Sequence, residues 1–431
     1  MQNLVKSSEI SSIEAWVPRG LIGNPENILS IPVTEEGLCP IRICWVDQRV
    51  ISLEKIEDSS NLPLKLLLPR LVEPHAHIDK AFTWEEFPNL SGNYDSALKR
   101  NLEELKVRSI ENLIQRSEKS LNLAFKNGLR SIRTHIDSFG FSGHQYWEAL
   151  IDLKIKWEKL IDLQCVALVP LEYWSSEEGC LLADRVANWG GLLGGVLVPP
   201  CRGKKTFKSL LELIKLANEL GCGIDIHIDE SSREPGSGLK QLIRVLDSFE
   251  NKVPITCSHL SSMGLLSPNR LKYMADRLAS HQVNVVALPF TNAWLLGRKQ
   301  NETPVKRPLA PIRQLQEAGV TVAIGGDNVQ DPWFPYGDFD PITLISGALP
   351  LTQLAPWERL GLAPFTTSAA ALMGLNWDGT IKINGPANFV ILKATTWAEA
   401  LSSKPCRELI VDGTRFDEET LSNSPKADAF N

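Results

Sequence analysis

The chain has 431 residues, 43% of them hydrophobic and 22% charged, which suits a globular protein with a sizeable core. Acidic residues outnumber basic ones by 51 to 45, and the net charge of −6 predicts no basic surface for nucleic acid. No apolar stretch reaches the roughly 18 residues that would predict a membrane span. The N-terminus shows no signal-peptide pattern, and the eight cysteines form no Cys-x-x-Cys pair. We therefore expect a cytoplasmic protein with reduced cysteines.

The two ends of the chain differ in pattern from its middle. Residues 1–65 and 380–431 contain short alternating stretches broken by Gly and Pro, for example residues 41–46, 388–392 and 408–413. Such stretches are typical of short strands, and the last ends in an Asp-Gly turn signal. We expect both ends to form one small β-sandwich-like domain.

Between them, residues 66–379 alternate short apolar runs with longer amphipathic stretches. Near-continuous apolarity is typical of parallel strands that are covered on both faces. Eight such β/α units favour an α/β fold with a closed (β/α)8 TIM barrel over an open sheet. No Gly-x-Gly-x-x-Gly begins any of the helices, which argues against a dinucleotide site. The eight runs are residues 66–78, 130–137, 161–170, 192–199, 223–229, 255–260, 283–289 and 321–327.

The first run ends in a His-x-His pair, His75 and His77. Side chains on a strand alternate between faces, so both imidazoles project to the same side. Such a pair can hold a divalent metal at the end of a barrel strand, where catalytic residues gather. Ordinary core or surface histidines also occur at this spacing, so the pair needs further support.

Polar residues at later strand ends supply that support. His227 lies near the end of the fifth run, His259 ends the sixth, and Asp327 ends the eighth. Three histidines and one carboxylate form a nitrogen and oxygen ligand set that suits zinc or divalent iron. His135 lies in the second run. Two roles stay open for it: it supports the metal ligands, or it is an ordinary core histidine.

Four motifs together resemble the amidohydrolase superfamily, and within it the cytosine-deaminase-like branch. They are Pro74-His75-Ala76-His77, His227-x-x-Glu230, Ser258-His259 and Asp327-Asn328-x-x-Asp331-Pro332-Trp333. The resemblance extends over nearly the whole chain.

The resemblance implies a role for each matching residue. Glu230 corresponds to the proton shuttle, His259 to the histidine that polarises the attacking water, and Trp333 to an aromatic residue near the substrate. Some relatives bridge two metals with a carboxylated lysine at the end of strand four, but here that strand ends in Pro199-Pro200. The resemblance therefore implies one divalent metal, zinc or iron, with the ligands His75, His77, His227 and Asp327.

The sequence departs from the cytosine deaminases at Leu171. Those enzymes usually place a glutamine after the proline of strand three, where this chain has Pro170-Leu171-Glu172. A leucine cannot supply the donor and acceptor that read a cytosine edge, so we expect a different heterocycle.

The function expected from this resemblance is metal-dependent hydrolysis of a C–N bond, not a peptide bond, in a small aminated heterocycle. Deamination of a nucleobase-like ring is the leading hypothesis. Hydrolysis of a cyclic amide or an N-substituted amine uses the same ligands and stays open, as does an inactive binding or regulatory homologue. The oligomeric state, a homo-oligomer included, is equally open. Lys80 is expected to pair with a carboxylate or to meet the substrate.

Overall fold

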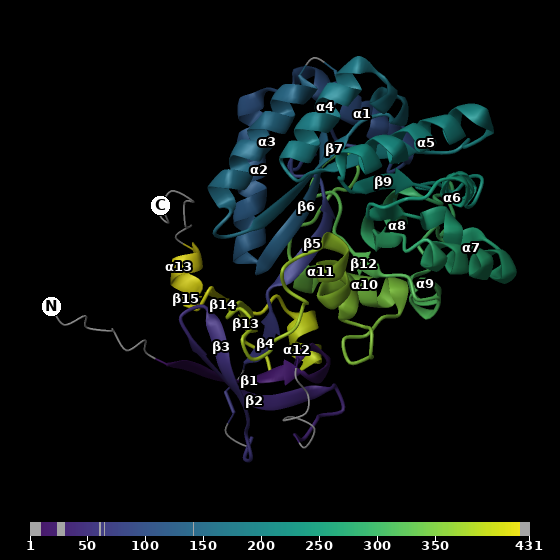
Figure 1. The fold of residues 1–431 in the computed structure, drawn as a ribbon. Coiled ribbons are helices and arrows are strands. Elements are labelled where there is room, and N and C mark those ends of the chain that lie inside the picture. Colours follow the sequence, from purple (N-terminus) through teal and green to yellow (C-terminus); the bar gives the residue numbers. More distant parts are fainter. Residues whose placement is uncertain (1–9, 24–30, 60–61, 64, 141, 423–431) are drawn as a thin grey trace. The chain divides into compact units, whose positions relative to one another are not determined.

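The computed structural model describes residues 10–23, 31–59, 62–63, 65–140 and 142–422, and Figure 1 shows the course of the chain. Two compact units can be separated by their internal contacts. The first comprises residues 1–72, 125–130 and 340–431, and the second comprises residues 73–124 and 131–339. The domain limits that we predict at residues 65/66 and 379/380 stay a prediction.

The second unit is built around an eight-stranded parallel sheet in the order β12-β11-β10-β9-β8-β7-β6-β5. A parallel bridge between Ala76 and Asp327 joins its two edges, and Asp327 N donates to His75 O at 3.0 Å. The predicted TIM barrel is therefore confirmed. Its strands are β5 (Leu71–Ala76), β6 (Leu129–Asp137), β7 (Asp162–Leu168), β8 (Leu192–Leu197), β9 (Ile224–Ile228), β10 (Ile255–His259), β11 (Asn284–Ala287) and β12 (Val322–Ile324).

Glu73, a residue of β5, stabilises the closure of the barrel between β5 and β12. Its carboxylate accepts hydrogen bonds from His75 N at 3.1 Å and from Gly326 N at 2.9 Å. A Cβ atom on Gly325 would lie only 2.7 Å from the same carboxylate, so this position requires glycine. The Gly-Gly pair before Asp327 thus lets the last strand approach the first.

Helices lie around the outside of these strands in Figure 1. Local signals set several of their ends: Asn93 Oδ1 accepts from Ser96 N at the start of α1, and Gly221, at φ 67°, ends α5. The helices of this unit are α1 (Tyr94–Val107), α2 (Ile110–Lys126), α3 (Gly143–Trp157), α4 (Glu177–Asn188), α5 (Gly203–Leu220), α6 (Ser237–Ser248), α7 (Pro268–Ser280), α8 (Pro289–Leu295) and α9 (Ile312–Glu317).

The first unit contains a seven-stranded sheet in the order β15-β14-β13-β4-β1-β2-β3. It combines strands from both ends of the chain, as predicted, and Asp412-Gly413, both at positive φ, connect β14 to β15. Its elements are β1 (Ser11–Pro18), β2 (Leu38–Val46), β3 (Arg49–Lys55), β4 (Leu66–Pro69), β13 (Phe389–Leu392), β14 (Arg407–Val411), β15 (Thr414–Phe416), α10 (Pro341–Thr352), α11 (Thr367–Met373), α12 (Trp397–Ser402) and α13 (Glu418–Ser422).

The prediction of a single strand over residues 66–78 is wrong. The segment forms two strands, β4 and β5, which belong to different sheets. Pro69, which has no N–H to donate, ends the β4 pairing with β13. The next residue, Arg70, is buried and donates from Nη2 to Leu129 O at 2.5 Å. A buried polar residue after a proline therefore marks the change of sheet.

No helix in the described ranges is both long enough and apolar enough to cross a membrane.

Candidate metal centre and active site

Five histidines gather at the carboxyl ends of the barrel strands. His75 and His77 come from the end of β5, His135 from β6, His227 from β9 and His259 from β10. The ring centroids of neighbouring pairs lie 3.9 to 5.5 Å apart, and all five residues are buried. The structure therefore brings together every histidine that the sequence places at a strand end.

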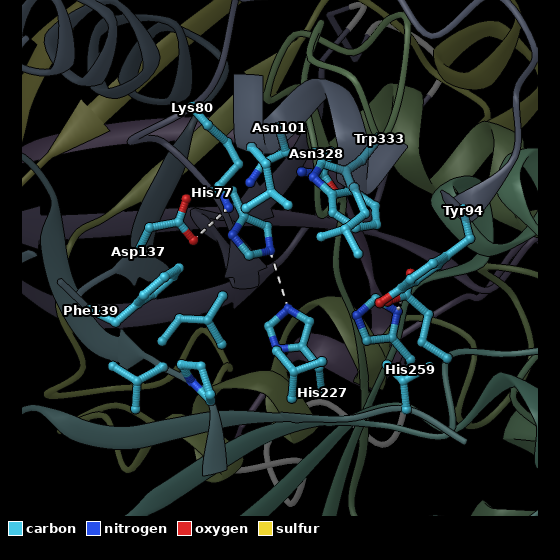
Figure 2. A pocket seen from close by; sticks show the side chains of 18 of the residues that line it. His77, Lys80, Tyr94, Asn101, Asp137, Phe139, His227, His259, Asn328 and Trp333 are labelled. Atoms are coloured by element: carbon cyan, nitrogen blue, oxygen red, sulfur yellow. Dashed lines mark hydrogen bonds and ion pairs between the residues drawn. The ribbon is translucent and has the colours of Figure 1, made fainter. Parts of the chain in front are cut away.

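The four predicted ligands converge on one point. Asp327 Oδ1 lies 3.6 Å from His75 Nε2 and 3.4 Å from His77 Nε2. His227 Nε2 lies 3.3 Å from His77 Nε2, the contact drawn as a dashed line in Figure 2. Two of these histidines and Asp327 meet the spacing needed to hold a metal ion. A metal ion between these nitrogen and oxygen atoms could be bound by all four side chains.

The unpaired atoms at this point fit a cation. Both carboxylate oxygens of Asp327 and His75 Nε2 are buried and have no hydrogen-bond partner among the described residues. A buried carboxylate without a partner is costly, and a divalent ion removes that cost. Burial and the neighbouring histidines hold the pKa of His75 and of His227 well below the usual range. These rings are therefore neutral, which is the form that binds a metal.

A chain of hydrogen bonds fixes the orientation of His75. Ser258 Oγ donates to Asp225 Oδ1 at 2.7 Å, and Arg133 Nη1 donates to Asp225 Oδ2 at 2.8 Å. Because the Ser258 hydrogen is committed to Asp225, His75 Nδ1, at 2.9 Å, must be the donor to Ser258 Oγ. The lone pair of the neutral ring then lies on Nε2, towards Asp327.

Glu230 enters the site through a turn after β9. Asp229 has a positive φ of 56°, and its carboxylate accepts from Gly238 N and Leu239 N at the start of α6. This cap holds the turn, and Glu230 lines the cavity just beyond it. Burial, and then the charge of Asp327, raises the pKa of Glu230 well above its usual range. Its surroundings therefore favour the neutral, protonated form of Glu230.

His259 lies next to Glu230. Its Nδ1 is 3.5 Å from Glu230 Oε1 and 3.1 Å from Asn292 Nδ2. Burial lowers the pKa of His259 to about 4, so the ring is neutral. When Asn292 donates to Nδ1, the ring hydrogen lies on Nε2, which has no partner among the described residues.

The loop after β12 holds Trp333. Asp331 is buried and accepts from Asn328 Nδ2 at 2.7 Å and from the backbone N–H groups of Trp333 and Phe334. Trp333 packs edge-on against Tyr94 of α1, with ring centroids 5.1 Å apart. Asp331 therefore shapes the loop, and Trp333 forms part of the cavity wall.

A buried network of charged groups supports β5, β6 and α1. Lys80 Nζ lies 2.9 Å from Asp137 Oδ1, and Arg108 contacts Asp137, Asp79 and Glu104 at 2.5 to 3.1 Å. Lys80 thus pairs with a carboxylate, as one of the two alternatives has it, and it also lines the cavity. Contact with the substrate stays a prediction.

The cavity beside the metal centre has a volume of about 450 Å³. Figure 2 shows His77, His227, His259 and Trp333 among the side chains that line it. Leu171 also lines it, from the short helix η3 (Leu171–Ser175) after β7, and Trp174 Nε1 anchors that helix by donating to Gly194 O at 2.8 Å.

Several residues that matter here were not predicted. Asp225, Asn292, Tyr94 and Asn101 contact the site or line its cavity. For α1 a signal exists, because Tyr94, Leu98, Asn101 and Leu102 share the i, i+4, i+7, i+8 spacing of one helix face.

His135 packs against His75 with the two rings tilted, at a centroid distance of 3.9 Å and an interplanar angle of 32°. Its Nε2 lies 3.8 Å from Asp225 Oδ2. His135 therefore contacts a predicted ligand and the carboxylate that orients it.

The chain is similar to known proteins over most of its length. The model of the amidohydrolase family matches residues 183–416. Pterin deaminase of Rhizobium rhizogenes is 31% identical over 343 residues, which cover 78% of this chain and 77% of that protein. N-isopropylammelide isopropyl amidohydrolase of Pseudomonas sp. (strain ADP) is 26% identical, covering 86% and 92%.

The fold matches solved structures as well. A 5-methylcytosine deaminase from Klebsiella pneumoniae superposes with a TM-score of 0.77 at 24% identity, covering 94% of this chain and 98% of that chain. These matches confirm the family resemblance and the fold. The chain belongs to the amidohydrolase family and is a metal-dependent hydrolase that cleaves C–N bonds.

Proposed function

We propose that this enzyme deaminates a 2-amino-4-oxo heterocycle of the pterin type. The observation that carries the proposal is the 31% identity to a pterin deaminase over 78% of the chain. Leu171, in place of the glutamine usual in cytosine deaminases, supports a substrate other than cytosine. A cavity of about 450 Å³ lies within the range of roughly 300 to 1,000 Å³ that is typical of small-molecule sites.

The proposed metal ligands are the Nε2 atoms of His75, His77 and His227 and Oδ1 of Asp327. We propose one ion per chain, zinc or iron, because the ligand set is three histidines and one carboxylate. When bound, the metal lowers the pKa of water from about 15.7 toward about 7, which supplies the nucleophile.

Three side chains of the protein are proposed to move the protons and orient the water: Asp327, His259 and Glu230. Asp327 Oδ2, the oxygen not assigned to the metal, accepts the proton of the attacking water. His259 orients that water through a hydrogen bond from Nε2. Glu230, whose neutral form is favoured by burial, donates its proton to the ring nitrogen next to the reacting carbon. It regains the proton that Asp327 accepted, passes it to the leaving amine, and finally takes up the proton of the new hydroxyl group. Water thus adds to the carbon, the C–N bond breaks, and ammonia leaves.

Ammonia release from a panel of pterins, purines, aminopyrimidines and aminotriazines tests the proposal. We expect the highest kcat/KM for a 2-amino-4-oxo pteridine, and a value for cytosine below about 10⁴ M⁻¹s⁻¹, an ordinary enzyme value. Efficient deamination of cytosine without turnover of any pterin would contradict both the substrate class and the role of Leu171.

The second candidate is hydrolysis of an N-substituted amine, and similarity to the N-isopropylammelide hydrolase favours it. The leaving group separates the two functions. Release of an alkylamine from N-alkylaminotriazines at a higher kcat/KM than release of ammonia from pterins would favour the second.

A further inference from the structure

Helix α1 contributes one face to the cavity wall. Tyr94, Leu98, Asn101 and Leu102 all line the cavity, and their spacing places them on the same side of the helix. Tyr94 and the two leucines present mainly apolar surface, which suits the face of a flat ring. Asn101 is the polar exception on this face.

The amide of Asn101 is buried and incompletely paired. The residue is only 7% exposed, and its Oδ1 has no hydrogen-bond partner among the described residues. A buried amide without partners costs free energy, and a ligand that supplies them gains affinity. In Figure 2, Asn101 is among the side chains drawn around the cavity.

Three other polar side chains of the wall are already engaged. Lys80 is paired with Asp137, and Asn328 Nδ2 donates to Asp331 Oδ2. Glu172, next to Leu171, is exposed on the surface, where it pairs with Lys205 at 3.0 Å. The Asn101 amide is therefore well placed to offer a substrate a donor and an acceptor side by side.

We propose that Asn101 reads the N–H and C=O edge of the heterocycle, in place of the amide that Leu171 does not supply. Oδ1 accepts from the ring N–H, and Nδ2 donates to the neighbouring carbonyl. A planar amide pairs with a cis-lactam edge in this way, and a leucine cannot. The assignment rests on the proposed function for the class of ligand, a 2-amino-4-oxo heterocycle.

Binding, measured without turnover, tests this inference separately from the activity. Glu230→Gln is the background, because it removes the proposed proton shuttle, and the probe is 2-amino-4-oxopteridine, titrated by calorimetry. We expect Asn101→Leu in this background to weaken binding roughly 10- to 100-fold, the effect of losing a hydrogen-bonded amide. Asn122→Leu is the matched control: Asn122, on α2, also has a buried Oδ1 without a partner among the described residues but does not line the cavity. The Asn122→Leu variant should bind 2-amino-4-oxopteridine with the affinity of the background.

A second variant tests the direction of the hydrogen bonds. Asn101→Asp keeps the acceptor and loses the donor, so it should weaken binding of 2-amino-4-oxopteridine. Protonation of this carboxyl group restores a donor, so the loss of affinity should shrink as the pH falls. A purely structural role of Asn101 would leave the loss unchanged with pH.

The outcomes separate the inference from the function. Equal affinity of the Asn101→Leu variant and its background would overturn the role of Asn101, even if the wild type deaminates pterin. Absence of binding of 2-amino-4-oxopteridine to the background would overturn it as well. Loss of affinity together with no ammonia release by the wild type would support the reading of the ring edge and reject the deaminase proposal.

Discussion

At the scale of single residues, position within the barrel decides the chemistry of similar side chains. Glu230 and Asp327 are both buried carboxyl groups at strand ends. Burial raises the pKa of Glu230, whereas the electrostatic influence of His77 and His259 outweighs burial at Asp327 and lowers its pKa. The surroundings therefore shift the two pKa values in opposite directions, as the proposed roles of a proton donor at Glu230 and a charged ligand at Asp327 require.

Two substitutions three residues apart should have different consequences. We expect Glu230→Gln to lower turnover by roughly 10²- to 10⁴-fold while the metal stays bound, because an amide of the same shape cannot shuttle a proton. His227→Ala should lose metal and activity together, because it removes a ligand. Metal analysis beside turnover of the substrate identified by the panel checks both. Near-normal turnover in Glu230→Gln would remove the shuttle role, and loss of metal would make Glu230 a ligand.

At the scale of elements, the sequence predicts strand ends better than it predicts helix faces. His227, His259 and Asp327 could be placed because each follows an apolar run, and parallel strands bring their ends together. The strand over residues 66–78 was wrong, because the apolar pattern is continuous across Pro69 although the sheet changes there. Asn101 was missed because a polar residue on a helix normally faces solvent, and only the packing of α1 shows otherwise.

The buried network of Lys80, Asp137 and Arg108 should stabilise the region where β5, β6 and α1 meet. Burial opposes charge on Asp137, but Lys80 and Arg108 outweigh it, so the pKa of Asp137 lies below its usual range. The group therefore contributes stability that is fully present above about pH 5 and is lost as pH falls towards the folded-state pKa. Asp137→Asn should lower the free energy of unfolding by about 3 to 5 kcal/mol at pH 7, since it takes from the buried Lys80 its carboxylate partner, whereas Arg108 keeps Asp79 and Glu104.

Denaturant unfolding between pH 3 and pH 8 measures this effect. The difference between wild type and Asp137→Asn should be constant from pH 6 to 8 and shrink towards pH 3. Asp276→Asn is the control, because its pair with Lys272 is exposed and should contribute little. A variant as stable as the wild type at pH 7 would show that the network does not stabilise the fold.

At the scale of the whole molecule, repeated β/α units predicted the barrel, and the Asp-Gly signal at residues 412–413 predicted a turn at the end of a strand; both are confirmed. Parallel strands are recognisable because they are buried on both faces. The order of the seven-stranded sheet was not predictable in the same way, because β4 lies between β1 and β13, and no local pattern encodes partners so distant in the chain.

The last prediction concerns the whole chain and its metal. We expect about one zinc or iron ion per purified chain, because the predicted ligands His75, His77, His227 and Asp327 converge on one point. Removal by a chelator should abolish activity and lower the melting temperature, since unpartnered Asp327 oxygens then stay buried. At a free metal concentration 100 times Kd, binding stabilises the folded state by about 2.7 kcal/mol. In His227→Ala, the chelator should not lower the melting temperature, and added metal should not raise it. A content near two ions per chain would contradict the single-ion site, and a metal-free, fully active enzyme would contradict the centre altogether.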